Sequence, residues 1–437
     1  MSKMAFLHTS SAESLKTELD LWAVPPTQTA VETGHWVTVN PLSTLDDANT
    51  IEFVVPGNGE EYIDPAHTLL YVQCKIVKGD GTNIAAADDV DVGPINYLLH
   101  SMWSQVDVSL NGKLVSQSAS TYGYRSYIET ALGYDHPAKT SHLTSRMWYK
   151  DTAGKMDVLA DNKGLDSRKL ITAGSKHFEM MGAMHGDIFN QDKYIINNVE
   201  MRITFQRAKD QFVLMSTHNE KLKILKMYLM VRKVLPSPAV RLGHAEAIML
   251  KPTSYPITRT DVKTVSITAG LQDKSIDNVY LGPTPKRITI GFVDNRAFNG
   301  SYAFNPFNFT HFQLNYLSLY IDSKQIPSKP LTPDFTNQEY IEAYHTLFSG
   351  TGIHFKDEGN DISRVDYPNG YCLFVFDLTS DMSANEGFWN LQRQGTVRLE
   401  VRFKEALAAP INCVILSEFN NLIEIDRHRN VVVDFSN

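Results

Sequence analysis

The sequence predicts an all-β protein in which one antiparallel β-sandwich occurs twice in tandem. Short apolar segments with strand-like alternation recur along the chain, and turn signals separate them. Four motifs also occur twice, in the same order and about two hundred residues apart. The matching pairs are residues 94–97 and 306–309, 106–115 and 317–326, 127–129 and 340–342, and 199–208 and 397–406. A repeat of this length is too long for a solenoid, whose repeats have periods of about 20–50 residues. It is the size of a domain.

An extended N-terminal arm is predicted for residues 1–30. Pro25 and Pro26 remove two backbone donors and force an extended path, which excludes a helix and a central strand. The apolar side chains of Leu19, Leu21 and Trp22 come shortly before them and need burial. We expect these five residues to pack either on the body of the same chain or on a neighbouring molecule.

The first copy is predicted to span residues 31–237. β-branched and aromatic residues dominate its apolar segments, and Asn111-Gly112 is a strong signal for a two-residue hairpin turn. Strands are expected at residues 67–77, 106–110, 201–205 and 222–234, and the spacing of apolar residues predicts a helix at 122–132.

The second copy is predicted to span residues 238–437, after a linker at 236–238. Strands are expected at residues 287–293, 314–321, 371–376, 397–403 and 413–419, with a short helix at 338–347. About eight strands in each copy, joined by long connections that carry helices, are typical of a jelly roll. The predicted fold is therefore two tandem eight-stranded antiparallel jelly-roll sandwiches with short helices in the loops.

The charge balance argues against direct, extensive or sequence-specific binding of nucleic acid. The chain has 41 basic and 49 acidic residues, a net charge of −8 and no basic block, whereas coating nucleic acid requires many Lys and Arg side chains on phosphates. No apolar stretch approaches the roughly 18 residues that span a bilayer, and no signal peptide is recognised. Cys74, Cys372 and Cys413 are scattered, and we expect them to be reduced and structural, as in a protein that folds in the cytosol or nucleus.

We predict no enzymatic activity, no catalytic residue, no cofactor and no metal site. The sequence has no nucleophile elbow, phosphate-binding loop, dinucleotide fingerprint or zinc-binding helix motif. His177 and His185 come nearest to a metal-ligand spacing, but ordinary packing or surface placement is the favoured interpretation. Asp88, Asp89 and Asp91 lack the spacing, the glycine and the distal glutamate of a calcium loop, so they predict a solvated acidic loop.

Aromatic residues are interleaved with asparagine between residues 298 and 309. Such rings can stack on sugars or bases, but no Arg or Lys lies between Phe298 and Phe312 to hold a phosphate. We favour a protein–protein contact or a loop that packs on its own sandwich. The candidate contact residues are Phe298, Tyr302, Phe304, Phe307 and Phe309.

Several segments resemble one family of viral proteins. They are residues 18–31, 62–76, 94–134 and 401–435, of which the first and third are the most specific. In these segments the chain resembles the major capsid proteins of the Polinton (Maverick) and adintovirus group. That group belongs to the double jelly-roll lineage that includes adenovirus hexon.

The resemblance implies a structural role in a virion capsid. Similar proteins form homotrimers whose six jelly rolls make a pseudo-hexameric capsomer, and such capsomers tile an icosahedral shell around double-stranded DNA. Two near-equivalent sandwiches in each chain allow three-fold symmetry to imitate six-fold packing. The implied partners are further copies of the chain, penton proteins and minor capsid proteins, with the arm near the inner side of the shell. Synthesis is then expected in the host cytoplasm or nucleus.

A tandem β-sandwich protein that binds or cleaves carbohydrate is the alternative. That class is expected to be secreted and to cluster tryptophans on one concave face. The five tryptophans are instead spread along the chain, at Trp22, Trp36, Trp103, Trp148 and Trp389. The sequence leaves open whether the chain comes from a replicating virus or from an element carried in a host genome.

Overall fold

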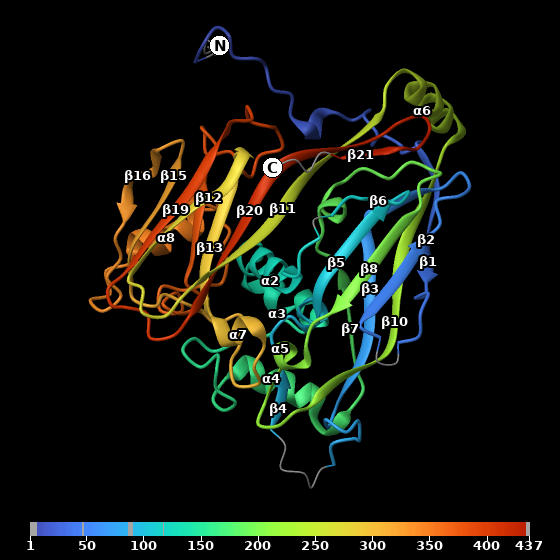
Figure 1. Cartoon of the computed structure of the whole chain (residues 1–437). Coiled ribbons are helices and arrows are strands. Elements are labelled where there is room, and N and C mark those ends of the chain that lie inside the picture. Colours follow the sequence, from blue (N-terminus) through green and yellow to red (C-terminus); the bar gives the residue numbers. More distant parts are fainter. Residues whose placement is uncertain (1–6, 46–47, 86–90, 117, 434–437) are drawn as a thin grey trace.

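Two β-sandwiches lie side by side, with short helices between and below them (Figure 1). The computed structural model describes residues 7–45, 48–85, 91–116 and 118–433. The all-β prediction is confirmed, because most regular elements in this part of the chain are antiparallel strands.

The first sandwich consists of two four-stranded sheets. One sheet has the order β1 (Val31–Val39), β10 (Lys221–Pro236), β3 (Tyr62–Val77) and β7 (Phe178–Ala183). The other has the order β2 (Thr50–Val55), β8 (Met201–Arg207), β5 (Trp103–Leu110) and β6 (Lys113–Leu114). The long strands β3 and β10 alternate between buried and partly exposed positions, as expected for strands with one face on a core.

The second sandwich repeats this topology. One sheet has the order β11 (Thr253–Ile267), β20 (Ile411–Ile425), β13 (Arg287–Asp294) and β18 (Leu373–Asp377), with β21 (Val431–Val433) added on β20. The other has the order β12 (Asp273–Pro283), β19 (Gln394–Phe403), β15 (Leu314–Ile321) and β16 (Lys324–Leu331). If the eight strands of each sandwich are counted along the chain, both sandwiches have sheets of order 1-8-3-6 and 2-7-4-5. This is the jelly roll that the sequence predicts, present twice; below, the two sandwiches are called the first and second roll.

Equivalent hairpins repeat in detail. The β5–β6 turn places Asn111 and Gly112 at φ 46° and 77°, and the β15–β16 turn places Asp322 and Ser323 at φ 48° and 67°. Positive φ at both central residues is the geometry that matches the twist of a two-residue hairpin. The side chain of the first turn residue also accepts the same bond in each roll. Asn111 Oδ1 accepts from the backbone N–H of Glu200 at 2.8 Å, and Asp322 Oδ1 accepts from that of Thr396 at 2.9 Å.

The pairing corrects one part of the sequence comparison. Leu110 pairs with Met201, and the equivalent Ile321 pairs with Val397, so Met201 corresponds to Val397. The motif comparison matched Val199 to Val397, which is two residues out of register. A shift of two residues keeps every side chain on the same face of a strand, so the alternating pattern could not reveal the error.

Helices and short strands occupy the connections between the strands, and η1 lies in the N-terminal arm. They are η1 (Thr17–Leu19), β4 (Val92–Pro94), α1 (Leu98–Ser101), α2 (Tyr122–Gly133), α3 (His136–Thr140), η2 (His142–Arg146), α4 (Lys163–Thr172), η3 (Ala173–Ser175), η4 (Asp187–Asn190), α5 (Asp210–Val213), β9 (Leu214–Ser216), α6 (Pro238–Leu250), α7 (Asn295–Asn299), β14 (Phe309–Thr310), α8 (Ile341–Ser349) and β17 (Asn369–Gly370). The predicted helices α2 and α8 lie in the same connection of the two rolls, between the fifth and sixth strands.

Several element bounds differ from the expectations, and three of these differences are informative. The segment at residues 236–238 is not a plain linker, because Pro238 occupies the first turn of the 13-residue helix α6. Proline is well suited to that position, where its missing N–H would be unpaired anyway. Strand β3 begins at Tyr62 rather than at 67, and its register with β10 slips between Met230 and Arg232, where residues 65–68 of β3 have no paired partner on β10. Helix α8 begins at Ile341 rather than at 338.

The two rolls share structure at their junction. Strands β11 and β20 are each 15 residues long, so they extend beyond the second roll. Their outer ends place Tyr255, Ile257, Ile423 and Ile425 in the buried core of the first roll. In return, α2 contributes Tyr124 and Tyr127 to the core of the second roll. The two rolls are therefore packed as one body.

Candidate functional site: surfaces for assembly

The N-terminal arm projects from the molecule with its apolar residues in solvent. Every side chain in its described part, residues 7–30, is exposed, and Leu19, Leu21 and Trp22 are 66%, 75% and 85% exposed. Pro25 and Pro26 are exposed as well. In this structure the arm therefore does not pack on the body of its own chain, which was one of the two alternatives from the sequence.

The root of the arm is fixed beside the end of β10. The side chain of Gln28 accepts from the N–H of Val31 at 2.7 Å and donates to its carbonyl at 3.1 Å. The carbonyl of Ala30 accepts from the N–H of Ser237 at 2.9 Å. Beyond this point the arm runs away from β1, on the side of the molecule that carries α6 (Figure 1).

The aromatic loop at residues 298–309 lies at the junction of the rolls. The Phe307 ring stacks on Tyr127 of α2 with 4.1 Å between centroids, and Phe298 stacks on Tyr124 at 5.5 Å. Phe307 and Phe309 are fully buried, whereas Tyr302 and Phe304 are partly exposed. Phe307 and Phe309 are therefore not accessible to a neighbouring chain in this structure, because helix α2 of the first roll covers them.

A buried polar network joins the rolls beside these rings. Arg168 on α4 is fully buried, and its guanidinium lies 2.6 Å from Asp151 Oδ1. The other oxygen of Asp151 accepts from Asn305 Nδ2 of the second roll at 3.2 Å. The Tyr371 hydroxyl donates to the Asp151 carbonyl at 2.6 Å. A buried ion pair needs such extra hydrogen bonds, because the attraction alone barely offsets desolvation.

Lys139 makes a second polar link between the rolls. Its Nζ donates to the carbonyls of Ala131 and Asn360 at 2.8 and 2.7 Å, and it lies 5.4 Å from the centre of the Trp148 ring. Burial lowers the pKa of Lys139 to about 7. Close by, Lys150 forms an ion pair with Asp366 at 2.9 Å.

The two histidines considered as metal ligands have different environments. His177 is exposed just before β7, and His185 is buried just after it. His185 Nδ1 lies 2.6 Å from Glu129, and its Nε2 lies 2.8 Å from the Tyr97 hydroxyl. Burial lowers the pKa of His185, against the opposing effect of Glu129. Among the described residues, no group of three or more potential ligands is arranged to hold a metal ion.

The remaining sequence candidates are surface and core residues. Asp91 forms an ion pair with Lys169 at 2.6 Å, and Asp88 and Asp89 lie outside the described residues. The three cysteines are free and buried, and burial raises the pKa of the Cys74 thiol to about 12.

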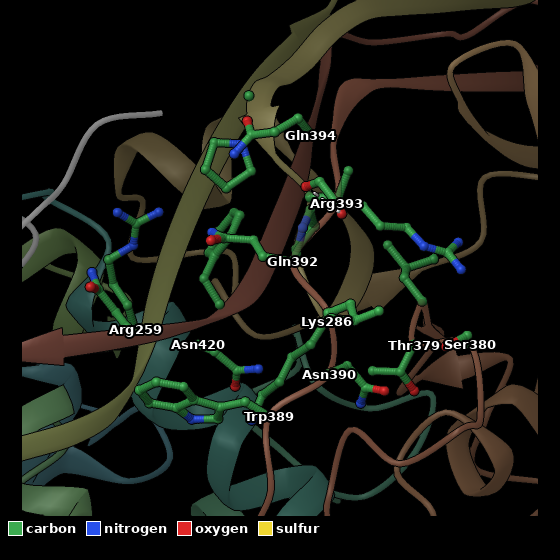
Figure 2. Close-up of a pocket in the computed structure, with 18 of the residues that line it drawn as sticks. Arg259, Lys286, Thr379, Ser380, Trp389, Asn390, Gln392, Arg393, Gln394 and Asn420 are labelled. Carbon is green, nitrogen blue, oxygen red and sulfur yellow. Dashed lines mark hydrogen bonds between the residues drawn. The ribbon is translucent and has the colours of Figure 1, made fainter.

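A cationic pocket at one end of the second roll was not foreseen. It has a volume of about 610 Å³ and lies among the β12–β13 turn, the loop between β18 and β19, and the outer parts of β11 and β20. Figure 2 shows Arg259, Lys286 and Arg393 around it, together with Trp389. Amide side chains complete the polar lining: Asn390, Gln392, Gln394, Asn420 and Asn421. No carboxylate occurs among the described residues that line it.

The β18–β19 loop that forms this pocket has internal hydrogen bonds and an apolar rim. Asp377 Oδ1 accepts from the N–H of Thr379 at 2.9 Å, and Asn390 donates to Ser383 Oγ at 2.8 Å. The carbonyl of Arg393 accepts from the N–H of Thr284 at 2.9 Å, which closes the loop onto the β12–β13 turn. Large apolar side chains of this loop and of the adjoining end of β12 are exposed, namely Leu281, Met382, Phe388, Trp389 and Leu391, of which the last two line the pocket. No sequence pattern predicts this site, because its residues come from four separate segments.

Comparison with known proteins places the chain among double jelly-roll structures. No family model matches the sequence. The uncharacterized protein F54H12.2 of Caenorhabditis elegans is 26% identical over 427 residues, which cover 94% of this chain and 99% of the nematode protein.

Three solved structures are similar over nearly the whole chain. A chain of the Sputnik virophage has a TM-score of 0.68 at 11% identity, covering 99% of this chain and 94% of its own. A chain of the PBCV-1 virus capsid has a TM-score of 0.57 at 9% identity, covering 95% and 100%. The mavirus major capsid protein has a TM-score of 0.50 at 11% identity, covering 99% and 97%. The protein is therefore a double jelly-roll protein with the fold of viral major capsid proteins.

No helix in the described part of the chain combines the length and the apolar character needed to cross a bilayer.

Proposed function

We propose that this protein is a structural major capsid protein, and that three copies form a pseudo-hexameric capsomer. The observation that carries the proposal is the side-by-side arrangement of two rolls with the same strand order and equivalent hairpins. Three such chains around a three-fold axis present six similar sandwiches, which can then pack as a hexagon. The likeness to the PBCV-1 capsid and to the mavirus major capsid protein supports the same role.

We further propose that the capsomers tile an icosahedral shell of a double-stranded DNA virus or a virus-like transposon of the Polinton and adintovirus group. The sequence resemblance to that group supports this assignment. A nematode protein that matches over 99% of its length favours an element that animal genomes carry. The proposed partners are further capsomers, penton proteins and minor capsid proteins, and the protein's proposed place is the virion capsid.

The proposed division of the chain follows from this role. Residues 1–30 serve as an assembly arm, and residues 31–237 and 238–437 form the two rolls. The buried junction at Arg168 and Phe307 fixes the two rolls relative to each other. A fixed angle is useful in a capsomer, because each chain then contributes two neighbouring corners of the hexagon. No catalytic step is part of this function.

Size-exclusion chromatography with light scattering tests the proposal on the purified full-length chain. We expect a particle of about three times the chain mass of 49.2 kDa and no binding on a glycan array. A stable monomer that binds glycans would contradict the proposal and support the carbohydrate-binding alternative.

A further inference from the structure

We propose that residues 18–22 of one copy dock into the cationic pocket of the second roll of another copy. This inference rests on the proposed function, since it describes how separate copies of the shell protein are linked. The segment and the pocket are complementary in charge and in apolar character, and the five residues of the segment are exposed in their own chain.

The segment offers alternating acidic and apolar side chains. Its sequence is Glu18-Leu19-Asp20-Leu21-Trp22, and all five residues are exposed. The 3-10 turn η1 ends at Leu19, and Asp20 Oδ1 accepts from the N–H of Ala23 at 3.2 Å. Local structure therefore exists before docking, which reduces the conformational entropy that binding would cost. An exposed tryptophan next to two leucines is a typical composition for the centre of an interface.

The pocket offers the matching features. Arg259, Lys286 and Arg393 line it without any carboxylate among the described lining residues. Burial lowers the pKa of Lys286, and the Arg259 guanidinium lies 4.6 Å from the centre of the Phe419 ring. An acidic segment would be attracted to this cationic lining. Trp389 and Leu391 on the rim are 52% and 95% exposed and can cover apolar side chains.

The geometry of the arm favours a second copy as the source of the segment. Eight residues lie between Trp22 and the fixed root at Val31, so an extended chain between the two reaches about 30 Å. In its own chain the segment remains in solvent rather than in the pocket. The Pro25-Pro26 pair stiffens the path between root and segment, which favours a projecting arm over one that folds back.

Fluorescence anisotropy tests the docking directly. A labelled peptide of residues 14–30 is titrated with full-length protein whose own arm carries Glu18→Lys, Asp20→Lys and Trp22→Ala, so that its pockets are free. We expect saturable binding that Arg393→Glu weakens by about tenfold or more, because a charge reversal at an exposed lining residue removes attraction and adds repulsion. Lys163→Glu is the matched control, an equal charge change at an exposed residue of α4 in the first roll, and it should leave binding unchanged.

Exchanging the charges of the peptide and the pocket distinguishes specific docking from nonspecific binding. The peptide with Glu18→Lys and Asp20→Lys should fail to bind the intact pocket and should regain part of its affinity for the Arg393→Glu protein. Peptide binding that is equal in all variants would overturn the proposal. A short DNA duplex that binds in an Arg393-dependent manner while the peptide does not would also overturn it, and would identify a phosphate site instead.

Disulfide trapping decides which copy supplies the segment. Leu21→Cys combined with Gln392→Cys in the full-length chain should give covalent multimers on a non-reducing gel, and the native cysteines are buried and do not interfere. Leu21→Cys with Lys163→Cys should give none. A disulfide that forms only within one chain would refute docking between copies.

The two proposals fail independently. Trimers by light scattering without peptide binding or cross-linked multimers would refute the docking and leave the capsid role intact. Peptide binding by a chain that never forms trimers would refute the proposed capsomer and leave the docking proposal intact.

Discussion

At the scale of single residues, the junction between the rolls depends on buried polar groups that satisfy one another. Arg168, Asp151 and Asn305 form one chain of bonds across it, although the latter two are 154 residues apart in sequence. Asp151 has no other cation in this network. Losing its partner would therefore leave a buried carboxylate that is very costly.

We predict that Arg168→Met lowers the free energy of unfolding by about 3–5 kcal/mol, the range for breaking a buried ion pair. Urea denaturation followed by circular dichroism measures this loss. Arg202→Met is the control, because Arg202 pairs with Glu52 at 2.7 Å on the surface, where solvent screens the pair, and its loss should cost much less. Equal losses in the two variants would contradict the buried network.

Acid should destabilise the protein through its buried histidines. Burial lowers the pKa of His100 and His185, and that of His311 to about 4. Below about pH 6.5 the unfolded chain binds protons at these sites while the folded chain does not, so stability falls as the pH falls. Glu129 acts in the same direction at lower pH, since Arg125 and His185 outweigh the effect of burial and lower its pKa to about 2.

For His311 the predicted loss is up to about 1.4 kcal/mol per pH unit between about pH 6.5 and 4, and His100 and His185 add to the loss in the same direction. Denaturant unfolding at a series of pH values measures it. His311→Phe should reduce the slope, because the phenyl ring keeps the stacking on Phe335, which lies 4.0 Å away, without the titrating group. Stability that is constant across this range would show that the histidines are not held neutral.

At the scale of elements, the sequence predicted the strands well because alternation and turn residues are local signals. The hairpin at Asn111-Gly112 and the helix α2 are where the pattern placed them. Helix α6 was missed, because Pro236 and Pro238 look like a linker when the fixed first turn of a helix is not considered. The arm was predicted as extended, but whether Trp22 is covered depends on another molecule, which no local pattern specifies.

The candidate sites were harder to predict than the strands. Burial of Phe307 depends on Tyr127, which belongs to the other roll, so the aromatic loop alone looked like a contact surface. The cationic pocket depends on Arg259, Lys286 and Arg393 converging from three separate elements. Such convergence is a property of the tertiary fold, and spacing along the chain carries no trace of it.

Substitutions in the two equivalent hairpin turns should change the stability of the protein in opposite directions. Ser323 has a left-handed φ of 67° where the first roll has Gly112 at 77°. Ser323→Gly should stabilise the protein by about 0.5–1 kcal/mol, because relief of the left-handed strain exceeds the added chain entropy. Gly112→Ala should destabilise it by about 1 kcal/mol; the added methyl meets no atom within 4 Å, so only backbone strain contributes. Thermal unfolding measures both effects. A shift of the melting temperature in the same direction for both variants would contradict this account.

Removing the arm should separate assembly from folding. Residues 7–30 contribute no buried side chain, so deletion of residues 1–30 should leave soluble trimers with an unchanged melting temperature. Shell formation should be impaired, because the arm is the proposed link between copies. Electron microscopy of assembly reactions measures this, and shells of normal yield from the truncated protein would refute the role of the arm.

At the scale of the whole molecule, duplication explains why one chain contains two fused rolls. The two rolls share strand order and hairpin geometry but differ in their connections, so in the proposed capsomer similar surfaces would meet different neighbours. The exposed features gather at one end: the arm, helix α6 with exposed Leu242, Met249 and Leu250, and the pocket of the second roll. The opposite end carries α4 and α7 (Figure 1).

Negative-stain electron microscopy of the purified full-length protein tests the central claim most directly. Averaged end-on views should show a particle of three subunits with a hexagonal outline and six similar densities, in which alternate densities match. Views of single two-lobed monomers, or of rings with any other number of subunits, would contradict the account.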